Sequence, residues 1–304
     1  MTKKFFHRYS WVLVGYIVLV ILWGAVVRAT GSGAGCGSHW PLCNGAVMPE
    51  LARIETVIEL VHRITSTLAG VLVIALTVMA YRLYGIRSKI TRWAFLGLVF
   101  IIIEGLLGRA LVVQEWVVDD ASAARAVAVA IHLANTYILL MTLTVTAWLS
   151  GKNHTIRMRG NQFLAFLVVT GIILAILFSA MGAVTALGDT LFPPESLFEK
   201  DQVSAGHFLV RLRVYHPVMA ILTSGYLIAV VRYVQRKQLG EKVNFRGNFL
   251  IGAILIQVLA GGFTVLTLAP LFMQVVHLLF ADVFWISLVL FTSEVLTIPV
   301  RKSN

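Results

Sequence analysis

Eight long apolar runs, separated by short clusters of charged residues, divide this chain. Each run is long enough to cross about 30 Å of hydrocarbon as an α-helix. Only 13% of the 304 residues are charged, whereas a soluble domain is about one quarter charged. The sequence therefore predicts an all-α, polytopic membrane protein. Its helices are expected at Trp11–Ala29, Ile54–Tyr81, Trp93–Val112, Ala126–Leu149, Phe163–Leu187, His207–Val234, Phe249–Pro270 and Leu271–Leu296.

The first run has a charged leader, Lys3, Lys4 and Arg8, as a cleaved signal peptide would. Its apolar stretch is too long for that reading, and Arg28 and a glycine-rich loop follow it without a clear small-residue cleavage site. We therefore predict a retained helix. No segment of transit-peptide type precedes it, so we expect the protein in a prokaryotic plasma membrane.

Most of the 25 lysines and arginines fall in alternate loops, which predicts the orientation of the chain. Positive residues favour the cytoplasmic side of a membrane. With both termini cytoplasmic, the inner set is Lys3, Lys4, Arg8, Arg82, Arg87, Lys89, Arg92, Lys152, Arg157, Arg159, Arg232, Arg236, Lys237, Lys242, Arg246, Arg301 and Lys302. Because these residues are dispersed over several short loops, the net charge of +11 does not predict a nucleic-acid partner.

Four landmarks recur in the same order in the two halves of the chain, at spacings of 145 to 158 residues. The recurring pairs are Gly24–Arg28 with Gly182–Ala186, His62 with His216, Glu104–Gly108 with Gln257–Gly261, and His132 with His277. Such internal similarity is typical of membrane proteins built from parallel repeats. We expect two pseudo-repeated four-helix bundles, residues 1–155 and 156–304.

Four of the eight histidines are expected at matched depth inside the even-numbered helices. His62, His132, His216 and His277 lie roughly 9–13 Å below the outer helix ends, at 1.5 Å per residue. A polar side chain at that depth is costly and usually functional. His7, His39, His154 and His207 fall in loops or at a helix mouth, where an ordinary polar role suffices.

Two histidines in each half form a suitable ligand set for haem iron. Facing helices of a four-helix bundle supply such axial pairs, whereas zinc requires three or four ligands at one site. We therefore predict one haem between His62 and His132 and another between His216 and His277. Arginines at the outer helix ends are candidates for binding the haem propionates, with membrane-interface positioning as the alternative. These arginines are Arg28, Arg63, Arg109, Arg125, Arg211 and Arg213.

The two halves differ in residues suited to catalysis. Glu59 precedes His62 by three residues, on the same helix face, and Arg213 stands at the matching position before His216. A carboxylate close to a haem edge could accept protons; alternatively Glu59 pairs with Arg63 or Arg53 at the helix end. Cys36 and Cys43 lie in the first outer loop, as a structural disulfide or as a redox-active pair.

The motifs Thr30–Cys36, Trp40–Cys43 and Glu59-Leu-Val-His62-Arg63 resemble those of the haem A synthase family. The resemblance extends over nearly the whole chain, although Pro217 follows His216 where relatives often have arginine, and the second half lacks a cysteine pair. It implies a membrane oxidoreductase acting on a CH group, which converts a methyl group of haem o into the formyl group of haem a.

The resemblance also implies the roles of the individual sites. Haem b would be permanently bound by His216 and His277, and the farnesylated substrate haem o would lie near His62 and His132. Glu59 would handle protons, haem b would pass electrons, and the product would supply cytochrome oxidase, with haem o synthase as a plausible partner. Two other functions fit the composition: a non-enzymatic di-haem b-type electron carrier, and a transporter with histidine proton relays.

Overall fold

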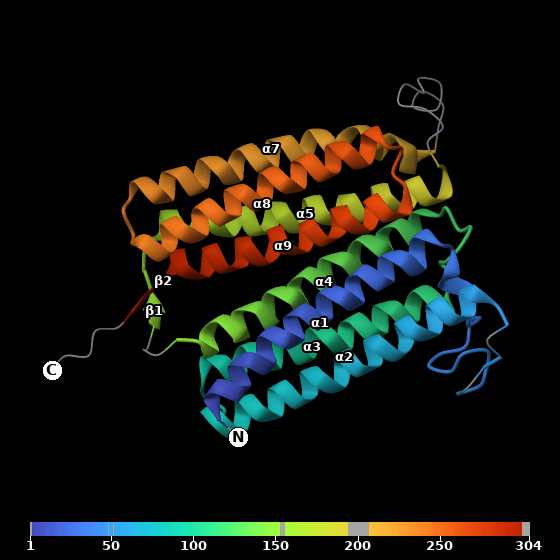
Figure 1. Ribbon diagram of the computed structural model, residues 1–304, viewed down its shortest axis with the longest axis horizontal. Coiled ribbons are helices and arrows are strands. Elements are labelled where there is room, and N and C mark those ends of the chain that lie inside the picture. Colours follow the sequence, from blue (N-terminus) through green and yellow to red (C-terminus); the bar gives the residue numbers. More distant parts are fainter. Residues whose placement is uncertain (1, 48, 51, 153–155, 194–206, 300–304) are drawn as a thin grey trace.

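The computed structural model describes all residues except 1, 48, 51, 153–155, 194–206 and 300–304. The described residues contain eight helices long and apolar enough to cross a membrane, which confirms the prediction of a polytopic, all-helical protein (Figure 1). They are α1 (Lys3–Ala29), α2 (Ile54–Tyr84), α3 (Lys89–Val113), α4 (Ala123–Ser150), α5 (Gln162–Leu191), α7 (Phe208–Arg236), α8 (Glu241–Leu266) and α9 (Leu271–Leu296). Shorter elements are η1 (Ser32–Ala34), β1 (Ile156–Met158) and β2 (Thr297–Pro299).

The helix boundaries differ most from the sequence prediction in α8. This helix begins at Glu241, eight residues before the predicted Phe249, since a polar first turn can form where the chain lies outside the hydrocarbon. It ends at Leu266 instead of Pro270, because Leu268 and Ala269 adopt positive φ values that no helix allows. The predicted break at Pro270 is confirmed, as this residue is the N-cap of α9.

The helices pack in two groups of four (Figure 1). One group is α1, α2, α3 and α4, and the other is α5, α7, α8 and α9. Contacts between the groups are made by α1 and α4 on one side and by α5 and α9 on the other. The largest cluster of buried apolar residues includes side chains from both groups, among them Leu140 and Trp285. The interface is therefore part of one continuous core. Side chains of both groups can line a cavity along it.

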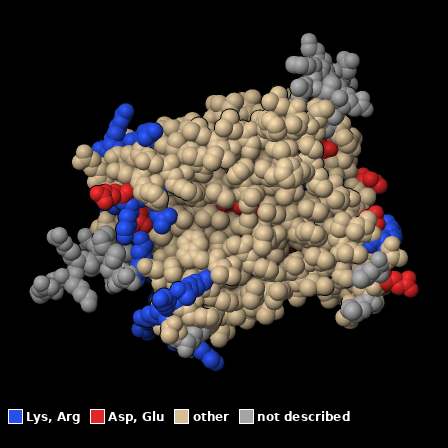
Figure 2. Space-filling model, viewed as in Figure 1, with Lys and Arg blue, Asp and Glu red and all other residues tan. Residues whose placement is uncertain are grey.

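The start of α1 and the end of α9 lie at the same end of the molecule (Figure 1). Lysine and arginine side chains gather at that end, and the middle of the visible face has few charges (Figure 2). There Glu294 of α9 accepts hydrogen bonds from Lys152 (2.9 Å) and from the Trp148 indole (3.0 Å) of α4. The antiparallel pair β1–β2 joins the segment between the two groups to the end of α9.

Candidate haem-binding site

A cavity of about 1130 Å³ lies between the helices, and all four predicted histidines line it. They come from four different helices: His62 from α2, His132 from α4, His216 from α7 and His277 from α9. Its other lining residues are mostly apolar. Pockets for one drug-sized ligand measure about 300–1,000 Å³. The volume is thus slightly above the range for one drug-sized ligand.

A glycine on the neighbouring helix faces each of these imidazoles. A Cβ atom added to Gly24 would lie 3.2 Å from Cε1 of His62, and one on Gly182 would lie 2.8 Å from Cε1 of His216. The corresponding distance is 2.9 Å for Gly261 and His277, and 4.0 Å for Gly108 and His132. The absence of side chains at these positions lets each ring pack against the backbone of the adjacent helix.

The imidazoles also have unused hydrogen-bonding capacity. Nδ1 of each of the four rings is buried and has no hydrogen-bond partner among the described residues. Buried polar atoms are normally satisfied, so four such nitrogens around one cavity fit imidazole rings that ligate a bound group. Among the described residues, no group of three or more His, Cys, Asp or Glu side chains could hold a bare metal ion. Two imidazoles per helix group, in an apolar cavity, fit haem iron.

Different residues surround the individual histidines. Oε1 of Glu104 lies 3.5 Å from Nδ1 of His132, and Asn135 and Thr136 donate hydrogen bonds to the same carboxylate. The side-chain nitrogen of Gln257 lies 3.3 Å from Nε2 of His277. The sequence did not predict these contacts, although Glu104 and Gln257 begin the matching segments of the two halves.

His216 of the second pair has an aromatic neighbour. Its ring stacks on Phe178 of α5, with ring centroids 4.5 Å apart and an interplanar angle of 4°. The stacking partner belongs to the helix that also supplies Gly182. Phe178 was not recognised from the sequence, because one phenylalanine in an apolar helix carries no distinguishing signal. The packing of α5 thus sets the orientation of the His216 imidazole.

Glu59 is buried at the edge of the cavity, and each of its carboxylate oxygens contacts a neighbouring group. Oε1 forms an ion pair with Arg63, at 2.5 Å from Nη2, and Oε2 accepts a hydrogen bond of 2.7 Å from the Cys36 backbone N–H. Arg53 pairs with Glu55 instead. Of the two helix-end partners considered from the sequence, the structure therefore places Arg63 beside Glu59.

Cys36 and Cys43 form a disulfide, which closes the loop that packs against Glu59. Arg63 donates hydrogen bonds of 2.7 Å to the carbonyl oxygens of His39 and Leu42 in the same loop. Trp40 and Pro41, also within it, line the cavity. The disulfide-closed loop is thus one wall of the cavity, and Glu59 and Arg63 hold it against α2.

A family model described as "Cytochrome oxidase assembly protein", COX15-CtaA, matches residues 7–289. The chain belongs to this family. A relative named "Protoheme IX farnesyltransferase", from Thermus thermophilus, is 42% identical over 298 residues, or 95% of this chain and 48% of the relative. The chain thus spans about half the length of that relative.

Relatives named "Heme A synthase" match shorter parts of the chain. One from Alkalihalophilus pseudofirmus is 36% identical over 157 residues, which are 51% of this chain and 51% of the relative. Another, from Bacillus cereus, is 44% identical over 97 residues, or 32% of this chain and 31% of the relative. The chain is thus a multi-pass membrane protein of the family described as "Cytochrome oxidase assembly protein".

The six arginines proposed for propionate binding occupy different environments in this family member. Arg28, Arg63, Arg125 and Arg213 line the cavity, whereas Arg109 and Arg211 are exposed and do not line it. Arg213 is engaged by Asp189, at 2.6 Å. Arg125 is 4% exposed, and its Nε has no hydrogen-bond partner, which leaves a donor for an anionic group.

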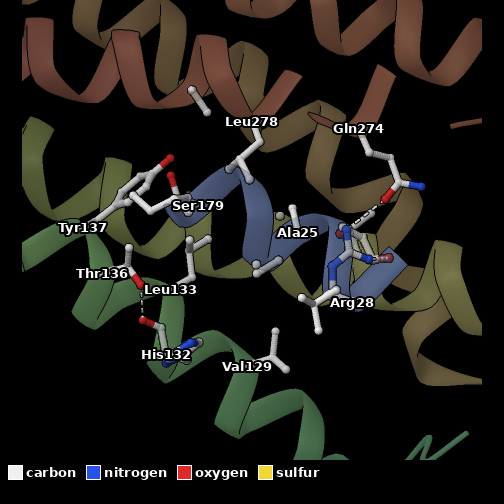
Figure 3. A pocket seen from close by; sticks show the side chains of 18 of the residues that line it. Ala25, Arg28, Val129, His132, Leu133, Thr136, Tyr137, Ser179, Gln274 and Leu278 are labelled. Atoms are coloured by element: carbon white, nitrogen blue, oxygen red, sulfur yellow. Dashed lines mark hydrogen bonds between the residues drawn. The ribbon is translucent and has the colours of Figure 1, made fainter. Parts of the chain in front are cut away.

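Arg28 crosses between the two helix groups. It was predicted near the first histidine pair, and its guanidinium also reaches the other group (Figure 3). It donates hydrogen bonds of 2.6 Å to the Ala186 carbonyl and the Thr190 hydroxyl of α5, and one of 2.9 Å to Gln274 of α9. Arg28 therefore stabilises the interface as well as lining the cavity. These partners are 158 to 246 residues away along the chain, so they could not be inferred from local spacing.

Replacing Gly261 by alanine is expected to reduce haem binding by the second histidine pair. The new methyl group would lie 2.9 Å from Cε1 of His277, closer than real side chains approach, so the imidazole must move. Gly252→Ala, on the same helix with no atom within 4 Å of the added Cβ, is the matched control. Haem content per purified chain measures the effect. Equal haem content in Gly261→Ala and Gly252→Ala would contradict the tight packing of His277 against Gly261.

Proposed function

We propose that this chain is a haem A synthase, which oxidises a methyl group of haem o to the formyl group of haem a. The observation that carries the proposal is the difference between the two halves of one histidine-lined cavity. In the first half, Glu59 lies at the cavity wall one helical turn from His62. Arg213 has the corresponding position in the second half. A simple electron carrier needs no such asymmetry.

The proposal assigns the two histidine pairs different ligands. Haem o, the substrate, lies near His62 and His132, and haem b is held permanently by His216 and His277. Bound there, haem b supplies one-electron transfer. The recurrence of a histidine with a facing glycine in both helix groups supports a pseudo-repeat of residues 1–155 and 156–304.

Glu59 has the position and contacts of a proton acceptor for the substrate. Oxidation of a methyl group to the alcohol level removes two electrons and, with oxygen supplied by water, releases two protons. Glu59 reaches the cavity while Arg63 and the Cys36 N–H keep its carboxylate oriented. Acid–base catalysis by such a group contributes about 10²–10⁴-fold to a rate.

The apolar tail of haem o requires a path to the lipid. Ile74 of α2 and Ile102 and Leu106 of α3 line the cavity, and each is more than half exposed, at 51%, 56% and 57%. These side chains border the region between α2 and α3, where we infer a lateral opening. We assign the farnesyl tail to this opening, where it meets the hydrocarbon of the bilayer.

Filling this opening should impair the substrate site alone. Gly105 of α3 lines the cavity, and an added Cβ would meet no atom within 4 Å, so a larger side chain fits without disturbing the fold. Gly105→Phe is expected to raise the apparent KM for haem o while haem b content stays unchanged. Gly15→Phe on α1, equally open and outside the cavity lining, is the control. Unchanged KM in Gly105→Phe would exclude this path.

The orientation, location and partners follow from the same assignment. Both termini are placed in the cytoplasm of a prokaryotic cell, and the disulfide-closed loop is placed outside the plasma membrane, where oxidation is favoured. Haem o synthase, a prenyltransferase, is proposed to supply the substrate, and cytochrome oxidase assembly receives the product. The twofold longer relative with a farnesyltransferase name supports a close link between prenylation and this chain.

Co-expression of this chain with a haem o synthase, followed by haem extraction and mass spectrometry, tests the proposal. We expect a formyl-bearing haem a that is absent when the chain is omitted. Haem b bound to the chain, with haem o left unchanged, would instead favour the di-haem electron carrier. Purified protein without any haem would leave a transporter with histidine proton relays as the better function.

A further inference from the structure

Asp282 of α9 is a fully buried carboxyl group that the proposed reaction does not use. Its exposed fraction is 0%, and neither of its carboxylate oxygens has a hydrogen-bond partner among the described residues. An ionised carboxylate without partners is costly inside a protein, and ionisable groups within membrane spans are usually functional. The burial of Asp282 therefore indicates a role in which its carboxyl group gains and loses a proton.

Asp282 lies where the two helix groups meet. Trp285, three residues later on the same face of α9, stacks on Tyr137 of α4 with ring centroids 5.0 Å apart. The Trp285 indole donates a hydrogen bond of 2.9 Å to the Tyr137 carbonyl. Asp282 thus lies close to Tyr137 across this contact. Each follows a predicted haem ligand by five residues, Asp282 after His277 and Tyr137 after His132.

A polar connection joins this junction to the cavity. The Tyr137 hydroxyl and the Ser179 side chain of α5 point toward one another, and both residues line the cavity (Figure 3). Ser179 follows Phe178, which stacks on His216. Hydroxyl groups both donate and accept hydrogen bonds, so Ser179 and Tyr137 can pass a proton between the cavity and the neighbourhood of Asp282.

Few other ionisable groups face Asp282. It is on α9, which packs chiefly against α8, α4, α1 and α5. The ionisable residues of α8 lie in its first six residues, and α5 has only Asp189, at its far end. Tyr9 and Tyr16 of α1 donate hydrogen bonds to carbonyl oxygens of α2. Besides Tyr137, α4 has Arg125 and His132; α9 itself also has His277 and Glu294.

We propose that Asp282 is a proton-binding site linked to the arrival of electrons between His216 and His277. An electron that enters this site removes one positive charge; the Asp282 carboxylate then binds one proton, delivered from the water phase through Ser179 and Tyr137. When the electron leaves, the carboxyl group releases the proton by the same route. Asp282 and His277 are separated by about 7.5 Å of rise along α9, and the low effective dielectric of the interior makes the two charges interact over such a distance. The inference rests on the proposed binding of haem by this histidine pair.

The pH dependence of the haem midpoint potential tests the inference in purified, haem-loaded protein. One proton taken up per electron lowers the potential by up to about 59 mV for each tenfold fall in proton concentration. We expect Asp282→Asn, a neutral isostere of the protonated acid, to lose most of this dependence. Glu294→Gln, which changes an ion-paired carboxylate on the same helix, is expected to retain it.

An infrared measurement separates proton binding from a structural effect. The reduced-minus-oxidised difference spectrum should contain a protonated-carboxyl C=O band that Asp282→Asn removes and Asp282→Glu shifts. If Asp282→Asn binds no haem, the shift of the C=O band in Asp282→Glu tests the inference instead. The inference would be overturned if both variants kept the wild-type pH dependence of the midpoint potential and the wild-type C=O band. Absence of haem from the His216–His277 pair in the wild-type protein would instead overturn the proposed function.

Discussion

Glu59→Gln is expected to lower the rate of haem a formation by about 10²–10⁴-fold, the usual contribution of a general acid or base. The amide cannot accept a proton from the substrate as the carboxylate does. Its oxygen can still accept hydrogen bonds from the Cys36 N–H or from Arg63, so the loop should remain in place. Product formation is measured by mass spectrometry of extracted haems, in membranes that contain equal amounts of protein.

The haem content of the same preparation shows whether Glu59 is catalytic or structural. A catalytic role predicts normal loading of both histidine pairs with haem o accumulating at the first. Loss of haem together with loss of product would mean that Glu59 serves to anchor the disulfide-closed loop. Glu55→Gln is the matched control, since Glu55 lies one turn earlier on α2 and pairs with the exposed Arg53.

His216→Ala and His277→Ala are each expected to remove haem b and leave haem at the first pair. Each substitution deletes one of the two proposed axial ligands, and no other described histidine lines the cavity besides His62 and His132. His62→Ala and His132→Ala should have the reverse effect, with haem b retained and haem o no longer held. Optical spectra of the purified variants, with haem quantified per chain, measure both losses.

His39→Ala is the control for these substitutions, because the His39 side chain is exposed in the first loop. It should retain both haems. Equal loss of both haems in all four ligand variants would contradict separate sites and would favour a single shared site or general unfolding. Thermal stability of the haem-free protein, measured for each variant, distinguishes these two outcomes.

Much of the architecture was predictable from hydropathy alone. In a bilayer every backbone polar group must be satisfied within its segment, so a long apolar run has few alternatives to a helix. Pro270 separates α8 from α9 as expected, because its ring cannot continue a helix. The start of α8 was missed, since the polar turn from Glu241 to Asn248 lies outside the apolar pattern.

Parts of the cavity were also predictable. The depth of each histidine follows from its distance along a helix, and a buried imidazole is costly enough to stand out in an apolar run. The lining of one cavity by all four is visible only in the structure. The same holds for the facing glycines, because small residues are common in membrane helices and carry no signal of which neighbour they face.

The helices and the spacing of the histidines and cysteines follow from local composition along the chain. The partners of long side chains depend instead on tertiary packing. It paired Arg28 with α5 and α9, left Arg109 and Arg211 exposed, and enclosed Asp282 without a partner. Such contacts depend on how distant helices pack and rotate against one another, which the order of residues along one helix does not specify.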